Sequence, residues 1–94
     1  MRLTNKELKA IKEYFREIFH EGSIYLFGSR MDDSRKGGDI DLYISTKDRE
    51  DLVWKKIRFL VLLKREIGEQ RVDVVLDYGG DRLIDQRGRG GMRL

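Results

Sequence analysis

The chain has 94 residues, enough for one small domain, and its lack of cysteine excludes disulfides, zinc–thiolate sites and cysteine nucleophiles. Apolar and charged residues each make up 39% of it, and no apolar run reaches the roughly 18 residues of a membrane span, so we expect a cytoplasmic globular domain that does not enter a membrane. Residues 1–77 are nearly neutral, with 16 Lys and Arg against 15 Asp and Glu, which argues against a dedicated nucleic-acid binder despite the net charge of +3.

The first expected element is an amphipathic helix over residues 5–20. Thr4 and Glu7 have the spacing of a capping box, in which each side chain accepts a hydrogen bond from the other residue's backbone N–H. Apolar residues then recur every three or four positions as far as Phe19, which is the period of a helix with one buried face. Gly22 follows, and a glycine can adopt the left-handed conformation that ends a helix.

Two strands are expected next. Residues 24–27 form a short, continuously apolar run that ends at Gly28, as a buried strand would. After a polar segment and a turn at Gly37 and Gly38, residues 39–44 alternate strictly between polar and apolar side chains. Because alternation with a period of two is typical of a strand, this pattern predicts the second strand.

A long helix follows, from a cap at Asp48 to a stop at Gly68. Its apolar residues cover more of the helix circumference than one buried face requires. The helix is therefore either buried on two faces or in contact with a partner. Phe59, Val61 and Leu62 are the candidate contacts for the second alternative, since an exposed apolar patch usually marks a partner site.

The last part of the chain is less regular. Residues 72–76 alternate again and predict a third strand, residues 81–86 could form a short helix, and a flexible Gly- and Arg-rich end is expected after Gly88. We therefore divide the chain into a domain of residues 1–78 and a C-terminal segment of residues 79–94. The order of helices and strands predicts an α/β (α+β) fold, a small mixed β-sheet flanked by helices.

Acidic residues carry the first chemical signal. Asp39 and Asp41 lie two positions apart on one expected strand, so their carboxylates leave the same face side by side and repel each other. A divalent cation would make this arrangement favourable, because magnesium prefers hard oxygen ligands. Asp73 adds a third carboxylate if its strand is the neighbour, although Asp77 lies on the same face of that strand. Three carboxylates are the usual scaffold of a two-metal site.

Gly28, Ser29 and Arg30 carry the second signal, at the C-terminal end of the first expected strand. Glycine lets the backbone approach a ligand closely, the serine hydroxyl can donate to phosphate oxygens, and arginine adds a fork-shaped cation. These three residues predict a phosphate-binding turn. Arg35 and Lys36 fit a solvated loop that could also reach a triphosphate.

These motifs together resemble the polymerase-β-type nucleotidyltransferase superfamily. The residues that carry the resemblance are Gly28-Ser29, then Gly38-Asp39-Ile40-Asp41-Leu42, then Val72-Asp73-Val74-Val75. The short length and the run from Gly28 to Leu42 most resemble its minimal nucleotidyltransferase (MNT) branch, the antitoxins encoded beside HEPN toxins. The resemblance covers residues 5–78 and implies the minimal nucleotidyltransferase fold.

The resemblance also implies a reaction and the residues that perform it. Gly28 and Ser29 would bind the nucleotide phosphates, Asp39 and Asp41 would bind magnesium, and Asp73 would complete a site for two Mg²⁺ ions and accept a hydroxyl proton. The donor would be ATP, and AMP would pass to a tyrosine hydroxyl of a HEPN toxin. The chain would then act as an antitoxin in a hetero-oligomer with that toxin.

Two alternatives from other classes stay open. A non-catalytic antitoxin would neutralise its partner by binding alone, but the intact Gly-Ser pair and three aspartates argue against a vestigial site. A small RNA-binding module would depend on the net positive charge and on the Arg- and Gly-rich residues 87–91. The nearly neutral body of the domain argues against that second alternative.

Overall fold

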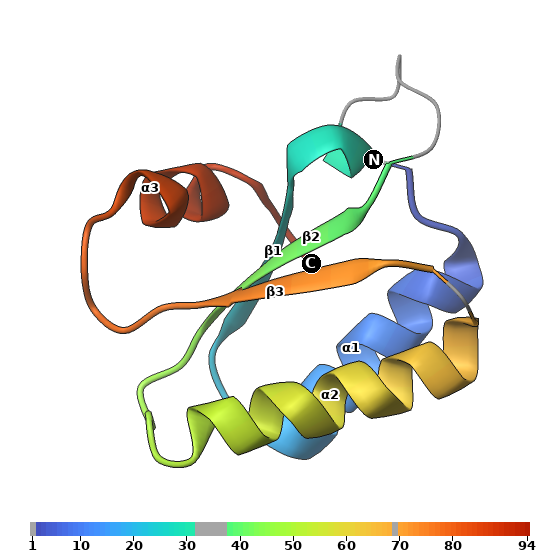
Figure 1. The fold of residues 1–94 in the computed structure, drawn as a ribbon, viewed down its shortest axis with the longest axis horizontal. Helices are drawn as coiled ribbons and strands as arrows, with labels where there is room; N and C mark the ends of the chain where they lie inside the picture. The colour runs from blue at the N-terminus through green and yellow to red at the C-terminus, as the bar shows by residue number, and fades with distance from the viewer. Residues whose placement is uncertain (1, 32–37, 69) are drawn as a thin grey trace.

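The computed structural model describes residues 2–31, 38–68 and 70–94 (Figure 1). Within these residues the elements are, in chain order, α1 (Asn5–Phe19), β1 (Ser23–Phe27), the 3-10 helix η1 (Gly28–Met31), β2 (Ile40–Ser45), α2 (Leu52–Ile67), β3 (Val72–Leu76), α3 (Leu83–Arg89) and β4 (Met92–Arg93). The predicted small α+β fold with a mixed sheet flanked by helices is confirmed. No helix in this described part of the chain is long and apolar enough to cross a membrane.

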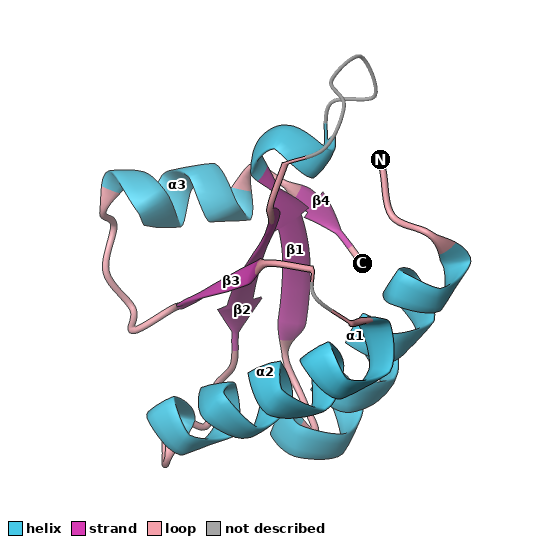
Figure 2. Cartoon of the chain, turned by 45° about the vertical axis from the view of Figure 1, so that its right-hand side comes forward, coloured by secondary structure: helices cyan, strands magenta, loops and turns pink. Residues whose placement is uncertain are grey.

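The four strands form one sheet in the order β3-β2-β1-β4 (Figure 2). β1 runs antiparallel to both β2 and β4, whereas β2 and β3 are parallel and are connected by α2. α1 and α2 lie together on one face of the sheet, and α3 lies over the other (Figures 1 and 2). The strand order makes β3 an edge strand of the sheet.

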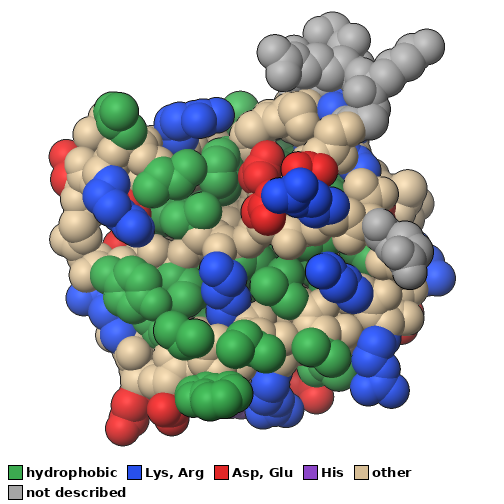
Figure 3. Space-filling model, in the orientation of Figure 1, with side chains coloured by type: hydrophobic (Ala, Val, Ile, Leu, Met, Phe, Trp, Pro, Cys, Tyr) green, Lys and Arg blue, Asp and Glu red, His purple; other side chains and the backbone are tan. Residues whose placement is uncertain are grey.

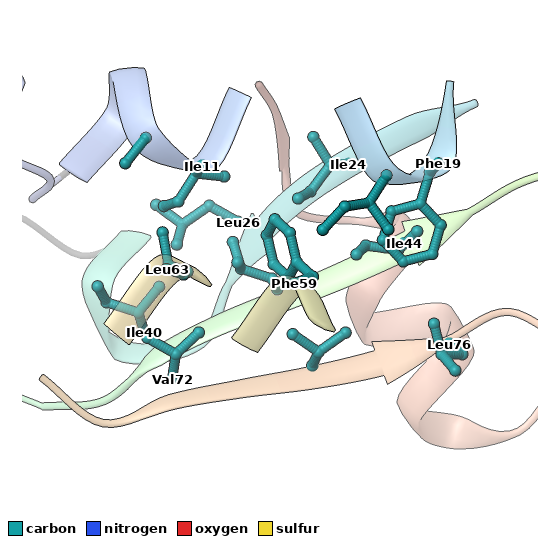
Figure 4. Close-up of a cluster of buried hydrophobic side chains, with 14 of the residues drawn as sticks. Ile11, Phe19, Ile24, Leu26, Ile40, Ile44, Phe59, Leu63, Val72 and Leu76 are labelled. Atoms are coloured by element: carbon teal, nitrogen blue, oxygen red, sulfur yellow. The ribbon is translucent and has the colours of Figure 1, made fainter. Parts of the chain in front are cut away.

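The hydrophobic core lies between the sheet and the layer of α1 and α2 (Figure 4). Phe59 of α2 is fully buried there, and its ring meets Phe19 of α1 edge-on with the ring centroids 6.1 Å apart. The prediction that Phe59 contacts a partner is therefore wrong, because this side chain belongs to the core. Leu62 also packs partly against the core, whereas Val61 is 51% exposed on the outer surface.

The capping box predicted for α1 is confirmed. Glu7 N–H donates to Thr4 Oγ1 at 3.1 Å, and Thr4 N–H donates to Glu7 Oε1 at 2.8 Å. The helix ends at Phe19, before the predicted stop at Gly22, because His20 itself takes a positive φ of 68°. The left-handed residue that ends this helix is thus a histidine.

α2 begins later than the sequence predicts. Asp48 does not cap the helix, because its carboxylate accepts the Glu50 N–H at 2.9 Å and so forms a local turn. Asp51 follows with a positive φ of 54°, and the helix starts at Leu52. An aspartate that bonds to a backbone N–H two residues on competes with helix formation in this way.

The C-terminal segment is regular where the sequence predicts a flexible end. α3 extends to Arg89, beyond the predicted residues 81–86, and β4 pairs with β1. A Cβ on Gly88 would overlap the ring of Tyr43, and a Cβ on Gly91 would overlap the backbone of Leu26. The glycines that suggest flexibility in the sequence therefore allow this segment to pack closely onto the sheet.

Candidate active site

The three predicted carboxylates come together at one end of the sheet. β2 and β3 are parallel neighbours, and their register places Asp41 directly opposite Asp73. Asp39 lies just before β2, and the pairing of β1 with β2 brings Gly28 to the same end. Asp77 lies beyond the far end of β3, where its carboxylate accepts a serine hydroxyl and a backbone N–H. The structure therefore separates Asp77 from the other three aspartates.

Two glycines allow the backbone to approach this cluster. Gly28 has a φ of 77°, and a Cβ there would overlap Asp41 Oδ2. Gly38 has a φ of 91°, and a Cβ there would overlap Ser29 Oγ. Both positions need a conformation that glycine adopts without strain and that leaves no side chain in the way. The Ser29 hydroxyl thus lies beside the backbone of Gly38, near the strand that carries Asp41.

The pKa of Asp41 shows that burial and the neighbouring carboxylates outweigh the nearby positive charges. Burial raises the pKa of this carboxyl above its ordinary value, and repulsion from Asp73 and then from Asp39 raises it further. The positive charges of Arg87 and Arg71 act in the opposite direction. A cation bound among the three carboxylates would relieve the same repulsion.

Arg71 is a member of the site that the sequence analysis missed. Its Nε lies 3.5 Å from Asp39 Oδ2 and 3.6 Å from Asp73 Oδ2, so one guanidinium bridges two of the three carboxylates. Acidic side chains and a basic one accordingly gather at one place on the surface in Figure 3. Arg71 lies two residues before Asp73 in the sequence, but that spacing gives no signal until the strand pairing is known.

Arg30 has different partners from those predicted. Its Nε donates to the Gly38 carbonyl at 3.1 Å and its Nη1 donates to the Arg2 carbonyl at 2.8 Å, while Nη1 also lies 3.7 Å from Glu7 Oε1. The guanidinium therefore links the backbone of Arg2 to the backbone of Gly38, beside Ser29. Its nucleotide-binding role stays a prediction, as does that of Arg35 and Lys36, which lie outside the described residues.

A buried network on the other face of the sheet holds α3 in place. Tyr43 Oη donates to Asp85 Oδ1 at 2.8 Å, and Arg82 donates to both oxygens of Asp85 at 2.8 and 3.0 Å. The Arg82 guanidinium keeps the pKa of Asp85 well below its usual range, and burial, with the bond to Asp85, raises the pKa of Tyr43 to about 12. This network fixes the helix that carries Arg87, whose charge acts on Asp41.

The fold and this constellation define a class of protein. Carboxylates on adjacent strands beside a Gly-Ser turn form a site suited to a metal-bound nucleoside triphosphate. The family model described as "Nucleotidyltransferase domain" matches residues 8–84, most of the chain. The chain therefore belongs to this nucleotidyltransferase family, which supports the resemblance to the polymerase-β-like superfamily and nucleotidyl transfer as the general reaction. No curated protein matches the chain.

The residues present fit the divalent metal that the family generally uses. Carboxylate oxygens are hard ligands of the kind that magnesium prefers, and the pKa of Asp41 is raised by burial and then by repulsion from Asp73 and Asp39, which a bound cation would relieve. Among the described residues, however, no three potential ligands already converge on one point. Arg71 lies between Asp39 and Asp73 instead, so these carboxylates would exchange one cation for another when metal binds.

Proposed function

We propose that this protein transfers AMP from MgATP to a hydroxyl of a partner protein. The observation that carries the proposal is the placement of Asp41 opposite Asp73 on parallel neighbouring strands, with Gly28 and Ser29 beside them. Asp39 and Asp41, with Asp73, would hold two Mg²⁺ ions. These ions supply charge neutralisation on the phosphates and orient the α-phosphate.

The protein's own residues have separate roles in this reaction. Gly28 and Ser29 bind the outer phosphates through backbone N–H groups and a hydroxyl. Asp73 accepts the proton of the acceptor hydroxyl, whose oxygen forms a bond to the α-phosphorus. The bond from the α-phosphorus to the bridging oxygen breaks, and pyrophosphate leaves with the electron pair. Positioning and electrostatic stabilisation therefore account for most of the catalysis.

The proposed acceptor is a tyrosine of a HEPN-type toxin, and the protein would act as its antitoxin in a hetero-oligomer. The resemblance to the MNT branch over residues 5–78 supports this partner.

The test is to incubate the protein with ATP labelled at the α-phosphate, magnesium and the product of a neighbouring gene that encodes a small all-helical protein. We expect the neighbour to become labelled. Ser29→Ala or Asp41→Asn should abolish the label, while Asp48→Asn, a matched change of an exposed aspartate away from the site, should leave it unchanged.

Two other results would contradict the proposal. A neighbour that binds tightly but stays unlabelled would indicate an antitoxin that acts by occlusion. Labelling that survives Asp41→Asn would show that the paired carboxylates do not carry the reaction. Nucleotide binding measured by calorimetry, with and without magnesium, separates loss of ATP binding from loss of transfer.

A further inference from the structure

The edge of β3 and the outer side of α2 form a surface that the site itself does not use. β3 is the outermost strand of the sheet, and a hollow of about 520 Å³ lies along it between α2 and the start of α3. Val53 and Ile57 of α2 border the hollow, and both are about half exposed, at 57% and 45%. Apolar side chains accordingly gather between these two helices in Figure 3.

The backbone of β3 has unused hydrogen-bonding groups on this open side. Ile40 N–H donates to the Arg71 carbonyl, and Asp77 N–H donates to the Ile44 carbonyl, so the odd-numbered residues of β3 bond to β2. In a parallel pair the alternate residues direct their backbone groups away from the neighbour. Val74 therefore points its N–H and carbonyl outward, and an extended chain could pair with them.

A hydrogen bond from Arg82 shows that the carbonyl of Leu76, at the end of β3, also points away from β2. Arg82 Nη2 donates to the carbonyl of Leu76 at 3.2 Å, and this bond lies on the side away from β2. A carbonyl oxygen can accept a second hydrogen bond, so Leu76 stays able to pair with an added strand.

The charge along this edge is positive. Lys56 borders the hollow and has no ion-pair partner among the described residues, whereas Arg82 is neutralised by Asp85. A second hollow near the start of β3 is lined by Lys64 and by Arg71, which is already paired with Asp39 and Asp73. A segment lying along the edge would therefore meet the charges of Lys56 and Lys64 on the side of α2.

We propose that this edge is the docking surface for the acceptor protein, an inference that rests on the proposed transfer reaction. The occupant is an extended segment of the partner, with apolar residues for the hollow and acidic residues for Lys56 and Lys64. It adds as a fifth strand beside β3. A second copy of the chain fits less well, because two-fold pairing of β3 would bring two basic α2 helices together.

This docking explains how an acceptor hydroxyl reaches the site. Asp73 immediately precedes Val74 on β3, so a segment paired with Val74 runs past the carboxylate that takes the proton. Gly28 and Ser29 lie on the far side of Asp41, next to β1. The nucleotide and the acceptor therefore approach the carboxylates from opposite sides.

The test selects ligands from a library of random octapeptides displayed on phage, with the purified full chain as target and without ATP. We expect the enriched peptides to alternate apolar residues with Asp or Glu, and to bind more weakly at high salt because the attraction is between exposed charges. Lys56→Glu should reduce their affinity about fivefold, because it removes an exposed charge pair and places a repulsive charge there. Lys12→Glu, a matched reversal on the exposed side of α1, should not change it.

Several outcomes would overturn the docking proposal: no enrichment, enrichment without acidic residues, or equal binding by the Lys56→Glu protein with its melting temperature unchanged. Sedimentation that shows a dimer sensitive to Val53→Glu would assign the edge to a second copy instead. A tyrosine-containing peptide that binds but is never labelled by MgATP would leave docking intact and contradict the transfer reaction. Labelling of the protein acceptor that is unchanged by Lys56→Glu would support the transfer reaction and contradict docking at this edge.

Discussion

Asp41 stands opposite Asp73, so its negative charge destabilises the metal-free protein. Cross-strand charge pairs change stability by roughly 0.2–1 kcal/mol and like charges destabilise, so we expect Asp41→Asn to raise the free energy of unfolding at pH 7 by an amount of about that order. Because the folded-state pKa of Asp41 is raised, the penalty is complete above that pKa and disappears as the pH falls below the ordinary value of 3.8. Urea unfolding of both proteins at pH 7 and near pH 3.5, with a metal chelator, measures this.

Arg71 reduces the repulsion among the carboxylates, because its guanidinium pairs with Asp39 and Asp73, which a metal would need as ligands. Removing this competing cation should strengthen Mg²⁺ binding, and since exposed ion pairs are worth roughly 0.2–1 kcal/mol, the gain in affinity for Arg71→Ala should be at most about fivefold. Calorimetric titration with MgCl₂ alone measures the effect. Weaker binding in the variant would contradict the exchange of cations and would make Arg71 part of the ligand shell.

At the scale of single elements, a buried hydrogen bond from Tyr43 of β2 to Asp85 holds α3 in place, and no local sequence pattern predicts it. Tyr43→Phe removes the donor to the buried carboxylate of Asp85, and bonds to charged groups are worth about 1.5–3 kcal/mol, so we expect a loss of that order in unfolding free energy. The ring remains to pack against Gly88, so the fold should persist.

The pH dependence of this variant checks the assignment. The folded state raises the pKa of Tyr43 from 10 to about 12, so the folded protein holds this proton more tightly than the unfolded chain does. Its contribution to stability is present below pH 10 and is lost as the pH rises toward 12. The stability difference between the wild type and Tyr43→Phe should therefore shrink between pH 9 and pH 11.5. A constant difference would mean that Tyr43 does not titrate in this way.

β4 is the second element whose contribution is visible only in the structure. The sequence alone predicts that residues after Gly88 form a flexible end that is dispensable for catalysis, yet β4 pairs with β1, and Leu94 N–H donates to the Ile24 carbonyl at 2.9 Å. A chain that stops at Arg87 loses these bonds and the end of α3. Backbone hydrogen bonds contribute about 0.5–1.5 kcal/mol each, so we expect a loss of about 1–3 kcal/mol, measured as a lower melting temperature. An unchanged melting temperature would show that β4 adds no net stability. Nucleotide transfer by the shortened chain at close to the full rate would support the prediction that this end is dispensable for catalysis.

For the whole molecule, local patterns located most elements but not the contacts between them. The capping box and the alternation of residues 39–44 and 72–76 depend on neighbours in the chain, and these patterns predicted α1, β2 and β3 to within a few residues. Phe59 was misassigned because helical periodicity marks apolar faces without saying which one the sheet covers.

The residues of the candidate site likewise fall into two groups, those marked by a local motif and those that join through tertiary contacts. Gly28, Ser29 and the aspartates were visible as a motif with its own spacing, whereas Arg71 and Arg87 join the site only through strand pairing and the docking of α3. The same holds for β4, a strand of two residues among glycines, which has no periodicity to detect. Contacts of this kind depend on tertiary structure, so no local pattern could have revealed them.

Because residues from β1, β2 and β3 build one site, ligand binding should stabilise the molecule as a unit. MgATP that binds only the folded state, at a hundredfold excess over its Kd, adds about 2.7 kcal/mol to the unfolding free energy, which for a domain of this size raises the melting temperature on the order of 10 °C. Scanning calorimetry with MgATP, with ATP plus a chelator, and with Asp39→Asn/Asp41→Asn protein measures the shift. Only the wild type with magnesium should show the full shift in melting temperature. In that sample alone, the carboxylates and the Gly-Ser turn can both contact the metal-bound triphosphate. An equal shift without magnesium would indicate nucleotide binding by the cationic surfaces and would contradict the assignment of the carboxylates as the metal site.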